Sequence, residues 1–377
     1  MKLKYLSLFS GIGGFELGIG NKAKCIGFSE IDKYAIQVYK KQFNHKNYGD
    51  ITKINVQELP DFDLIVGGFP CQSFSIAGKR GGFKDTRGTL FFNIAEIARV
   101  KKPRLLLLEN VKGLLSHNEG NTFATIISTL DELGYDCQWQ VLNSKNFGVP
   151  QNRERVFIIG HLRGTSRPKV FPIGESNEES INKTDKQGIA NTLTGRSASG
   201  HNRRGNYIKT KEVINPLKGK TKYGWHCEQN IYDKKGITRT VKAGGGSGNM
   251  PKVIVKIPSA TKCGYEIAKE GDSIRLAHIG SKTGRGRVGK QRSQTLTAGG
   301  DMHTLHNSKI RRLTPRECER LQGFPDDWTE YGMADVISYG KKVAKEIVPI
   351  SDTQRYKMAG NAVSVPVIKA IVKRLIV

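Results

Sequence analysis

The sequence has no long apolar run, and this absence excludes one broad class of proteins. No stretch of its 377 residues approaches the roughly 20 consecutive apolar residues that a membrane-spanning helix needs. The first residues, Met1 to Tyr5, lead directly into strand-like sequence without the pattern of a signal peptide. We therefore expect a cytoplasmic protein with no membrane partner.

Clustered metal ligands are also missing. The six cysteines lie far apart, with no CxxC pair and no cysteine–histidine cluster at zinc spacing. They are Cys25, Cys71, Cys137, Cys227, Cys263 and Cys318. We expect reduced thiols and no metal.

Acidic residues are scarce relative to basic ones. The chain has 61 Lys and Arg against 34 Asp and Glu, a net charge of +27, which indicates a polyanionic partner. A merely soluble basic protein is the plainer alternative. Residues 183–262 hold 17 basic and 4 acidic side chains, so the excess is concentrated there. The middle of the chain is therefore the predicted surface for a nucleic-acid backbone.

A single thiol follows a stiffened turn near the end of a predicted strand. The apolar run 63–66 leads into Gly67 and Gly68, and Pro70 restricts the backbone directly before Cys71. A rigid turn of this kind can hold the Cys71 sulfur in position to act as a nucleophile. The alternative interpretation is a buried cysteine with a structural role.

Acidic residues end other predicted strands. Residues 4–9 predict a buried strand that enters a glycine-rich turn at Ser10-Gly11-Ile12-Gly13-Gly14, where a ligand can approach the backbone closely. About 20 residues further on, Glu30 ends a second strand, at the position of a ribose-binding carboxylate in a doubly wound sheet. The carboxylate of Asp50 is suited to accept hydrogen bonds from a ring that carries an amine. The alternative is an aspartate that only stabilises a turn.

The apolar run 105–108 ends in Glu109, so three acids and one thiol lie at strand ends, the ligand-binding edge of open α/β sheets. If residues 153–159 form a strand, Arg153 and Arg155 share a face. Two guanidinium groups on one face indicate an anion or a base edge, and a surface salt-bridge pair is the alternative.

The composition changes after Gly160. Residues 162–308 are rich in Gly, Lys, Ser, Thr and Asn and predict short strands without a long helix. Threonine-containing segments recur loosely around Thr192, Thr240 and Thr295, which indicates recognition loops. Helical sequence returns at Thr314, and we expect the helix from Gln354 onward to pack on the first sheet, so that both chain ends form the large domain.

These motifs, in this order, resemble those of the DNA (cytosine-5)-methyltransferases of bacterial restriction-modification systems and phages. The resemblance is close over residues 4–160 and 310–375. It rests on Phe9-Ser10-Gly11, Pro70-Cys71-Gln72, Glu109-Asn110-Val111, the run 151–155, Arg316-Glu317-Cys318 and Gly360-Asn361. In the middle of the chain the resemblance is one of general character and rests on no specific motif.

The resemblance implies an α/β fold: a Rossmann-like, doubly wound S-adenosylmethionine-dependent methyltransferase sheet with a smaller, mostly β and loop target-recognition domain. It divides the chain into a catalytic domain at 1–161 and a recognition domain at 162–308. Residues 309–377 would supply the edge of the recognition domain and the helix that completes the catalytic domain.

The resemblance also implies the chemistry. Carbon 5 of cytosine is a poor nucleophile, so Cys71 would first add to carbon 6 of a base flipped out of the duplex. A protonated Glu109 would stabilise the ring at N3, Arg155 would contact the cytosine carbonyl oxygen, and Arg153 would support the same site.

Two further sets of residues carry over. The cofactor set is Phe9, Gly11, Gly13, Glu30, Ile31, Asp50, Ile51, Pro70, Leu90 and Asn361. The DNA set is Gln72, Ser75, Arg87, Thr240 and Thr295, with residues 73–87 closing over the base. This chain departs from many members at Ile31, where they have an aromatic residue that stacks on adenine, and from some at Ala362, where they have serine.

The predicted function is therefore methylation of cytosine in double-stranded DNA by a monomer in the bacterial or phage-infected cytoplasm, associated with the nucleoid. A cognate restriction endonuclease would act on the same DNA site without direct contact. A tRNA cytosine-5 methyltransferase is the first alternative, and the long basic middle segment argues against it. A DNA-binding protein with a decayed active site is the second, and the retained Cys71, Glu109, Arg153 and Arg155 argue against decay.

Overall fold

The computed structural model describes most of the N-terminal and C-terminal thirds of the chain. The described residues are 2–70, 90–173, 213–214, 231–233, 252–259, 261, 263–275, 286–299, 302–306, 309–338 and 341–376. The chain divides into two compact units. The first comprises Met1–Glu179, Thr295–Gly300 and Thr314–Val377, and the second comprises Ser180–Gln294 and Asp301–Leu313. The domain boundaries at 162 and 308 stay a prediction.

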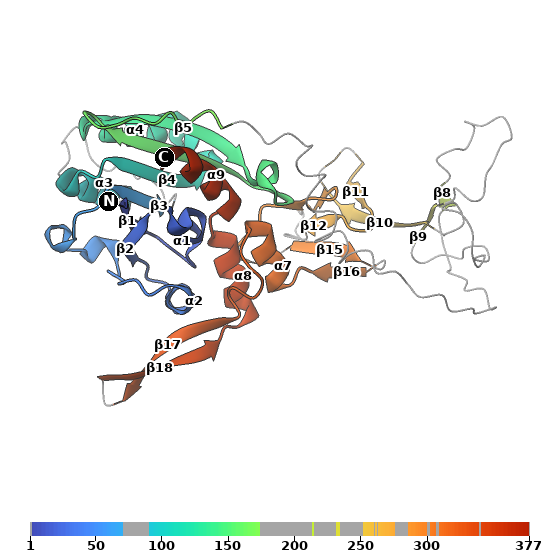
Figure 1. The fold of residues 1–377 in the computed structure, drawn as a ribbon. Coiled ribbons are helices and arrows are strands. Elements are labelled where there is room, and N and C mark those ends of the chain that lie inside the picture. Colours follow the sequence, from blue (N-terminus) through green and yellow to red (C-terminus); the bar gives the residue numbers. More distant parts are fainter. Residues whose placement is uncertain are drawn as a thin grey trace. The chain divides into compact units, whose positions relative to one another are not determined.

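A six-stranded mixed sheet forms the centre of the first unit, in the order β2-β1-β3-β4-β7-β5 (Figure 1). Its strands are β1 (Lys4–Leu8), β2 (Lys24–Ser29), β3 (Leu64–Gly68), β4 (Leu105–Val111), β5 (Tyr135–Asn143) and β7 (Glu154–Leu162). The first four are parallel, and β7 runs antiparallel to β4 and β5. The carboxyl ends of β1, β2, β3 and β4 therefore share one edge.

Helices cover both faces of this sheet, because alternate strand residues point to opposite faces. The helices are α1 (Gly14–Ile19), α2 (Lys33–Gln42), α3 (Leu90–Lys101) and α4 (Asn121–Glu132). On one face, Leu6 packs in a core with α3 and α4, and on the other Tyr5 packs in a core with α1 and the C-terminal helix. The predicted doubly wound α/β fold is confirmed.

Short elements connect these strands and helices. They are η1 (Gly20–Lys22), η2 (Ile51–Lys53), η3 (Val56–Glu58), η5 (Lys112–Leu115), η6 (His117–Gly120), η7 (Ser144–Phe147) and the two-residue strand β6 (Gln151–Asn152).

The C-terminal segment of the first unit contains three helices and a hairpin. These are α7 (Pro315–Gln322), β17 (Tyr331–Ser338), β18 (Lys341–Pro349), α8 (Asp352–Asn361) and α9 (Val365–Leu375). The expected return of the C-terminal helix is confirmed, because Ile368 and Ile371 of α9 lie in the core beside β1 and α1. One helix was expected and two are found, since Pro366 cannot continue a helix from α8.

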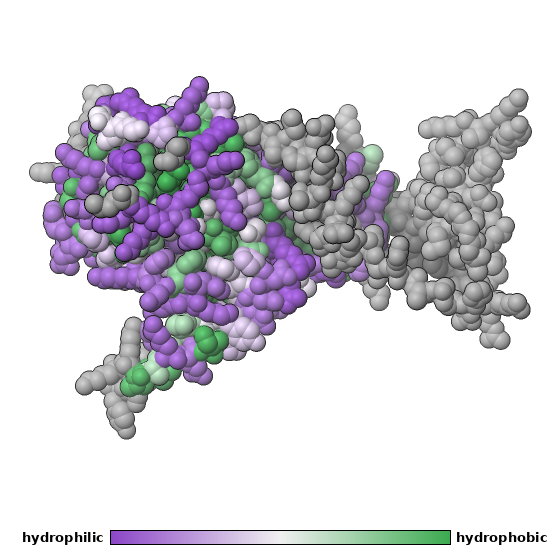
Figure 2. Space-filling view, in the orientation of Figure 1, coloured by the Kyte–Doolittle hydropathy of each residue, from purple (hydrophilic) through white to green (hydrophobic). Residues whose placement is uncertain are grey.

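The β17–β18 hairpin packs through β17 on α2. Lys40 of α2 forms an ion pair with Asp335, and its neighbour Lys41 lies over the ring of Tyr331. Figure 2 shows hydrophobic residues on the surface of the hairpin. Val343 and Ile347 of β18 are exposed.

The described part of the second unit contains only strands as regular elements. One sheet has the order β11-β10-β9-β8 and the other β13-β12-β15-β16. The strands are β8 (Val213–Ile214), β9 (Ile231–Asp233), β10 (Lys252–Pro258), β11 (Tyr265–Ala268), β12 (Ser273–Arg275), β13 (Arg287–Gly289), β14 (Ser293–Gln294), β15 (Met302–His306) and β16 (Lys309–Arg312). A small apolar core in the described part of this unit includes Ile257, Ile274 and Leu305.

Candidate active site

Glu109 lies near the carboxyl end of β4, directly opposite Gly68 on β3. A Cβ atom added at Gly68 would lie 3.0 Å from Oε2 of Glu109, so the glycine leaves room for the carboxylate. The Glu109 side chain is 12% exposed, which keeps it largely out of water. β3 and β4 together therefore hold an acid at the edge of the sheet where the parallel strands end.

Arg155 faces this acid from the neighbouring strand β7. Its Nε lies 3.0 Å from Oε1 of Glu109, and its Nη1 donates to the carbonyl of Glu154 over 2.8 Å. The structure thus brings together the acid and one of the arginines that the sequence singled out.

Arg153 has a different environment, because β7 begins one residue later, at Glu154. Its guanidinium is buried, with Nη1 donating to the carbonyl of Gly360 over 3.1 Å and Nη2 to that of Ala362 over 2.8 Å. Burial, and then the charge of Arg155, lower the pKa of Arg153 to about 9, while Glu109 opposes this shift. Arg153 therefore connects the strand-end site to the end of α8.

The segment that leads to Cys71 is fixed from β4. Nδ2 of the buried Asn110 donates to the carbonyl of Phe69 over 3.0 Å, and its Oδ1 accepts from the N–H of Val111 over 2.8 Å. The chain is therefore anchored two residues before Cys71. Sequence reasoning did not select Asn110 as a site residue, although its place directly after Glu109 was a signal.

Several predicted residues lie outside the described part of the chain. They are Cys71, Gln72, Ser75, Arg87, Thr192 and Thr240. Thr295 is described and belongs to the first unit, where its hydroxyl donates to the carbonyl of Asn152 over 2.9 Å.

The glycine-rich turn after β1 adopts a backbone that most residues avoid. Phe9, Gly11 and Gly13 have φ values of 52°, 55° and 88°. A Cβ atom added at Gly11 would meet nothing within 4 Å, so the turn borders open space. Oε2 of Glu30 accepts from the N–H of Gly11 over 2.8 Å, and Oε1 accepts from the N–H of Ile31 over 2.8 Å. The predicted carboxylate thus lies directly beside the predicted turn.

The remaining predicted cofactor residues lie at strand or helix ends. Asp50 accepts from the N–H and the hydroxyl of Thr52, and these bonds lower the pKa of Asp50. Ile51 is buried, whereas the side chain of Ile31 is 72% exposed. Pro70 is exposed after β3, Leu90 opens α3, and the exposed Asn361 ends α8.

Metal ligands do not gather in the part of the chain that the structure describes, where no group of three or more His, Cys, Asp or Glu residues could hold an ion. None of the described cysteines Cys25, Cys137, Cys263 and Cys318 is in a disulfide. None of the described helices is both long and apolar enough to cross a membrane.

The chain is similar in fold to solved structures of methyltransferases. A methyltransferase of Entamoeba histolytica, EhMeth, matches with a TM-score of 0.54 at 17% identity, covering 100% of this chain and 98% of that one. The Dnmt2 methyltransferase of S. pombe matches with a TM-score of 0.52 at 18% identity, covering 99% and 98%. At these identities the likeness shows the fold.

Comparison of sequences identifies the family. Residues 3–377 match the C-5 cytosine-specific DNA methylase family. The type II methyltransferase M1.ScrFI of Lactococcus lactis subsp. cremoris is 36% identical over 100% of this chain and 78% of its own length. M.HpaII of Haemophilus parainfluenzae is 35% identical over 100% and 89%, and the orphan methyltransferase M.SPRI of Bacillus phage SPR is 32% identical over 100% and 98%.

The chain belongs to the C-5 cytosine-specific DNA methylases, and it is a DNA (cytosine-5)-methyltransferase. The resemblance inferred from the motifs and the predicted enzyme class are confirmed.

Proposed function

We propose that this enzyme flips a cytosine out of duplex DNA and methylates its carbon 5 through a covalent adduct with Cys71. The observation that carries the proposal is the pairing of Glu109 with Arg155 at 3.0 Å, at the end of the strand whose Asn110 anchors Phe69. An acid and a guanidinium beside the described residues that lead to Cys71 provide the polar groups that an activated cytosine ring needs.

The roles of these residues follow from the electronics of cytosine. Addition of the Cys71 thiolate to carbon 6 moves charge into the ring, and the acid form of Glu109 stabilises it at N3. Arg155 binds the carbonyl oxygen of the base. After methyl transfer, a base takes the proton from carbon 5, and the electron pair of that bond re-forms the double bond between carbons 5 and 6. The bond between carbon 6 and the Cys71 sulfur breaks, which releases the thiolate.

The residues around the glycine-rich turn fit S-adenosylmethionine, which would supply an electrophilic methyl group. The open space at Gly11 admits a ligand close to the backbone, and Glu30 has a second lone pair on Oε2 for a ribose hydroxyl. Asp50 suits the adenine amine, and the exposed Ile31 offers an apolar contact to the ring. Phe9, Gly13, Ile51, Pro70, Leu90 and Asn361 complete the proposed set.

Binding of DNA would depend on the positive charge of the protein and on moving the target base out of the duplex. Attack on carbon 6 comes perpendicular to the ring, which stacked neighbours cover in a duplex, so the base must leave the stack. Gln72, Ser75 and Arg87 would contact the DNA around the flipped base. The basic residues 162–308 would hold the duplex as the recognition domain, with Thr240 or Thr295 in base readout.

The proposed setting is a restriction-modification system in the cytoplasm, in which a monomer modifies each strand of a short DNA site. A cognate endonuclease would act on the same site without touching the enzyme.

Three measurements test this function. Transfer of labelled methyl groups should reach duplex DNA and leave tRNA unlabelled, whereas labelling of tRNA alone would overturn the proposal. Bisulfite sequencing of DNA from a host that expresses the chain should show protected cytosines at one short sequence. A fluorescent base analogue at the target position should brighten on binding if the base is flipped, and unchanged emission would contradict flipping.

A further inference from the structure

Trp328 reaches the glycine-rich turn from a distant part of the chain. Its Nε1–H donates over 2.9 Å to the carbonyl of Ile12, which lies between Gly11 and Gly13. The bond is buried and joins residues 316 positions apart. It is therefore a tertiary contact to the centre of the turn that we assign to cofactor binding.

The turn needs such a contact, because its backbone is not one that a free chain prefers. Left-handed φ angles at Phe9 and Gly13 limit how the turn can relax. The turn is also closely packed against α2 and its end, since a Cβ atom at Gly13 would lie 2.4 Å from the ring of Phe43. A shift of the Ile12 carbonyl would thus change the surface that the turn presents.

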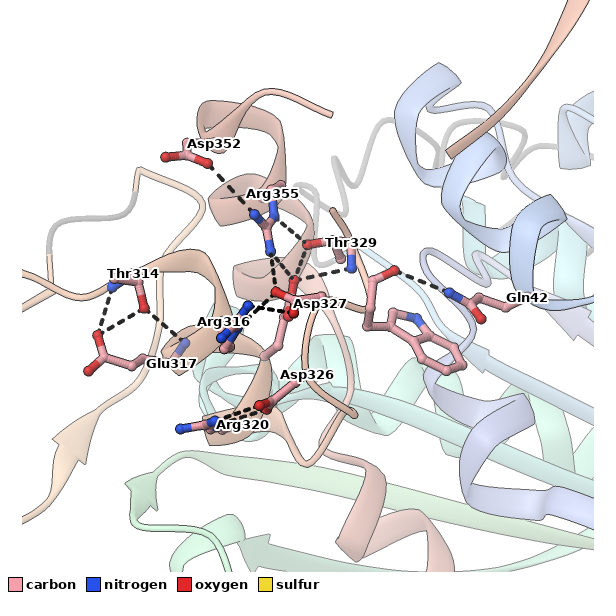
Figure 3. Close-up of polar contacts among 12 residues, drawn as sticks. Gln42, Thr314, Arg316, Glu317, Arg320, Asp326, Asp327, Thr329, Asp352 and Arg355 are labelled. Carbon is pink, nitrogen blue, oxygen red and sulfur yellow. Dashed lines mark hydrogen bonds and ion pairs between the residues drawn. The ribbon is translucent and has the colours of Figure 1, made fainter. Parts of the chain in front are cut away.

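A layer of aromatic rings holds the indole of Trp328. Its ring centroid lies 6.0 Å from that of Phe43 and 5.6 Å from that of Phe324. The amide of Gln42 donates to the carbonyl of Trp328 over 3.3 Å, and Figure 3 shows this side chain pointing from α2 toward the turn after α7.

A buried ion pair fixes the residue that follows Trp328. The side chain of Glu319 is fully buried, and its Oε1 accepts from the N–H of Thr329 over 3.1 Å and from the hydroxyl of Thr329. Arg355 donates from Nη2 to Glu319 over 3.0 Å and from Nε to the Thr329 hydroxyl over 3.1 Å. In Figure 3, Arg355 points from α8 toward Thr329 and Asp327.

We propose that Trp328 is a positioning residue for the cofactor turn, and that the Glu319–Arg355 pair sets the position of Trp328 through Thr329. This inference rests on the proposed use of the turn for S-adenosylmethionine. The indole N–H fixes the Ile12 carbonyl, and the buried pair prevents residues 328 and 329 from moving away. The conformation of the turn thereby depends on residues in the C-terminal part of the chain.

A purely structural role is the rival explanation, because large buried aromatic residues stabilise many cores. Trp328→Phe tests the donor, since phenylalanine keeps an aromatic ring at this position and has no N–H. The packing that is lost with the smaller ring is measured separately, as a fall in Tm. Trp139→Phe is the matched control, because Trp139 is 48% exposed and lies on the edge strand β5, which is not adjacent to β1.

The experiment measures the Kd of S-adenosylmethionine by calorimetry for the full chain and both variants, together with Tm without ligand. Loss of one buried hydrogen bond should weaken binding by Trp328→Phe about 5- to 10-fold, with kcat at saturating cofactor unchanged. Trp139→Phe should bind within about twofold of wild type. Normal binding by Trp328→Phe would overturn the inference, even if its Tm falls.

Glu319→Gln tests the second half of the inference. It keeps an oxygen for Thr329 and removes the charge that holds Arg355, so it should also raise the Kd. The double variant should bind no more weakly than the weaker single variant, because both changes act through one contact. If the increase in Kd of the double variant equals the product of the two single increases, the two residues do not act through one contact. Thr329→Val gives the same test if Glu319→Gln does not fold.

These outcomes are distinct from a failure of the proposed function. If the wild-type chain does not bind S-adenosylmethionine, the cofactor assignment itself is wrong. If the wild type binds and Trp328→Phe binds equally well, only the positioning role of Trp328 is wrong.

Discussion

Arg155 and Glu109 face each other across the β4–β7 pair, with 3.0 Å between Nε and Oε1. Both side chains are largely buried, at 15% and 12% exposed, so each restricts the rotamers of the other before substrate arrives. The polar half of the proposed site is therefore organised in the protein alone.

Arg155→Lys should lower kcat for DNA methylation about 100-fold while duplex binding stays near the wild-type value. Lysine keeps the charge but loses the planar donor geometry that fits both the Glu109 carboxylate and a carbonyl oxygen. Single-turnover methyl transfer measures the change. Arg163→Lys, at an exposed ion pair with Asp136, is the control, and an equal loss there would refute a specific role for Arg155.

Arg153→Met should lower the free energy of unfolding by about 1–3 kcal/mol. Its two bonds to the carbonyls of Gly360 and Ala362 are lost, and relief from burying a charge offsets part of that loss. Urea unfolding measures the change, with the exposed Arg163→Met as control. A variant as stable as the wild type would show that Arg153 does not hold the end of α8.

Ile31→Trp should tighten S-adenosylmethionine binding several-fold. Ile31 is 72% exposed, so the larger ring can be accommodated, and aromatic stacking on a base contributes about 1–3 kcal/mol. Ile347→Trp makes the same change at an exposed position on β18. Calorimetric affinities that rise equally in both variants, or in neither, would contradict an adenine contact at Ile31.

Glu16 should make stability depend on pH. Its carboxyl is buried in α1, where Oε1 accepts from the Tyr39 hydroxyl over 3.0 Å. Burial raises the pKa of Glu16 from 4.5 to about 7, so the folded state favours the neutral form. The stabilising effect is complete below pH 4.5 and is lost as pH rises through about 7, a loss of about 3 kcal/mol.

Glu16→Gln removes this titration. Urea unfolding between pH 4.5 and 8 should show the variant gaining stability relative to wild type by about 3 kcal/mol as pH rises. Glu132→Gln, at an exposed position in α4, should show no such gain. A constant difference between Glu16→Gln and wild type would rule out the raised pKa.

Local signals in the sequence were enough for most of the first unit. Asp32, the N-cap of α2, accepts hydrogen bonds from the N–H groups of Tyr34 and Ala35, and Thr314 forms a capping box with Glu317 at the start of α7. Each of these interactions spans only a few residues. The positions of Glu30 and Glu109 near strand ends were predicted from the apolar runs that precede them, and such a run is also a local pattern.

Long-range contacts could not be predicted in this way. The bonds from Arg153 to Gly360 and from Trp328 to Ile12 depend on how the C-terminal helices return to the sheet. No periodicity near either residue encodes its partner. The β17–β18 hairpin was missed as well, since its exposed Val343 and Ile347 do not give a clear alternation of apolar and polar residues.

Covalent trapping by duplex DNA that carries 5-fluorocytosine at the target position shows directly whether Cys71 is the nucleophile. The fluorine cannot leave as a proton does, so an enzyme that uses Cys71 should accumulate an adduct that survives denaturation. Cys71→Ser should bind the duplex and form no adduct, and Cys263→Ser, which removes an exposed free thiol, should trap like the wild type. An adduct formed by Cys71→Ser would contradict the assignment of Cys71 as the nucleophile.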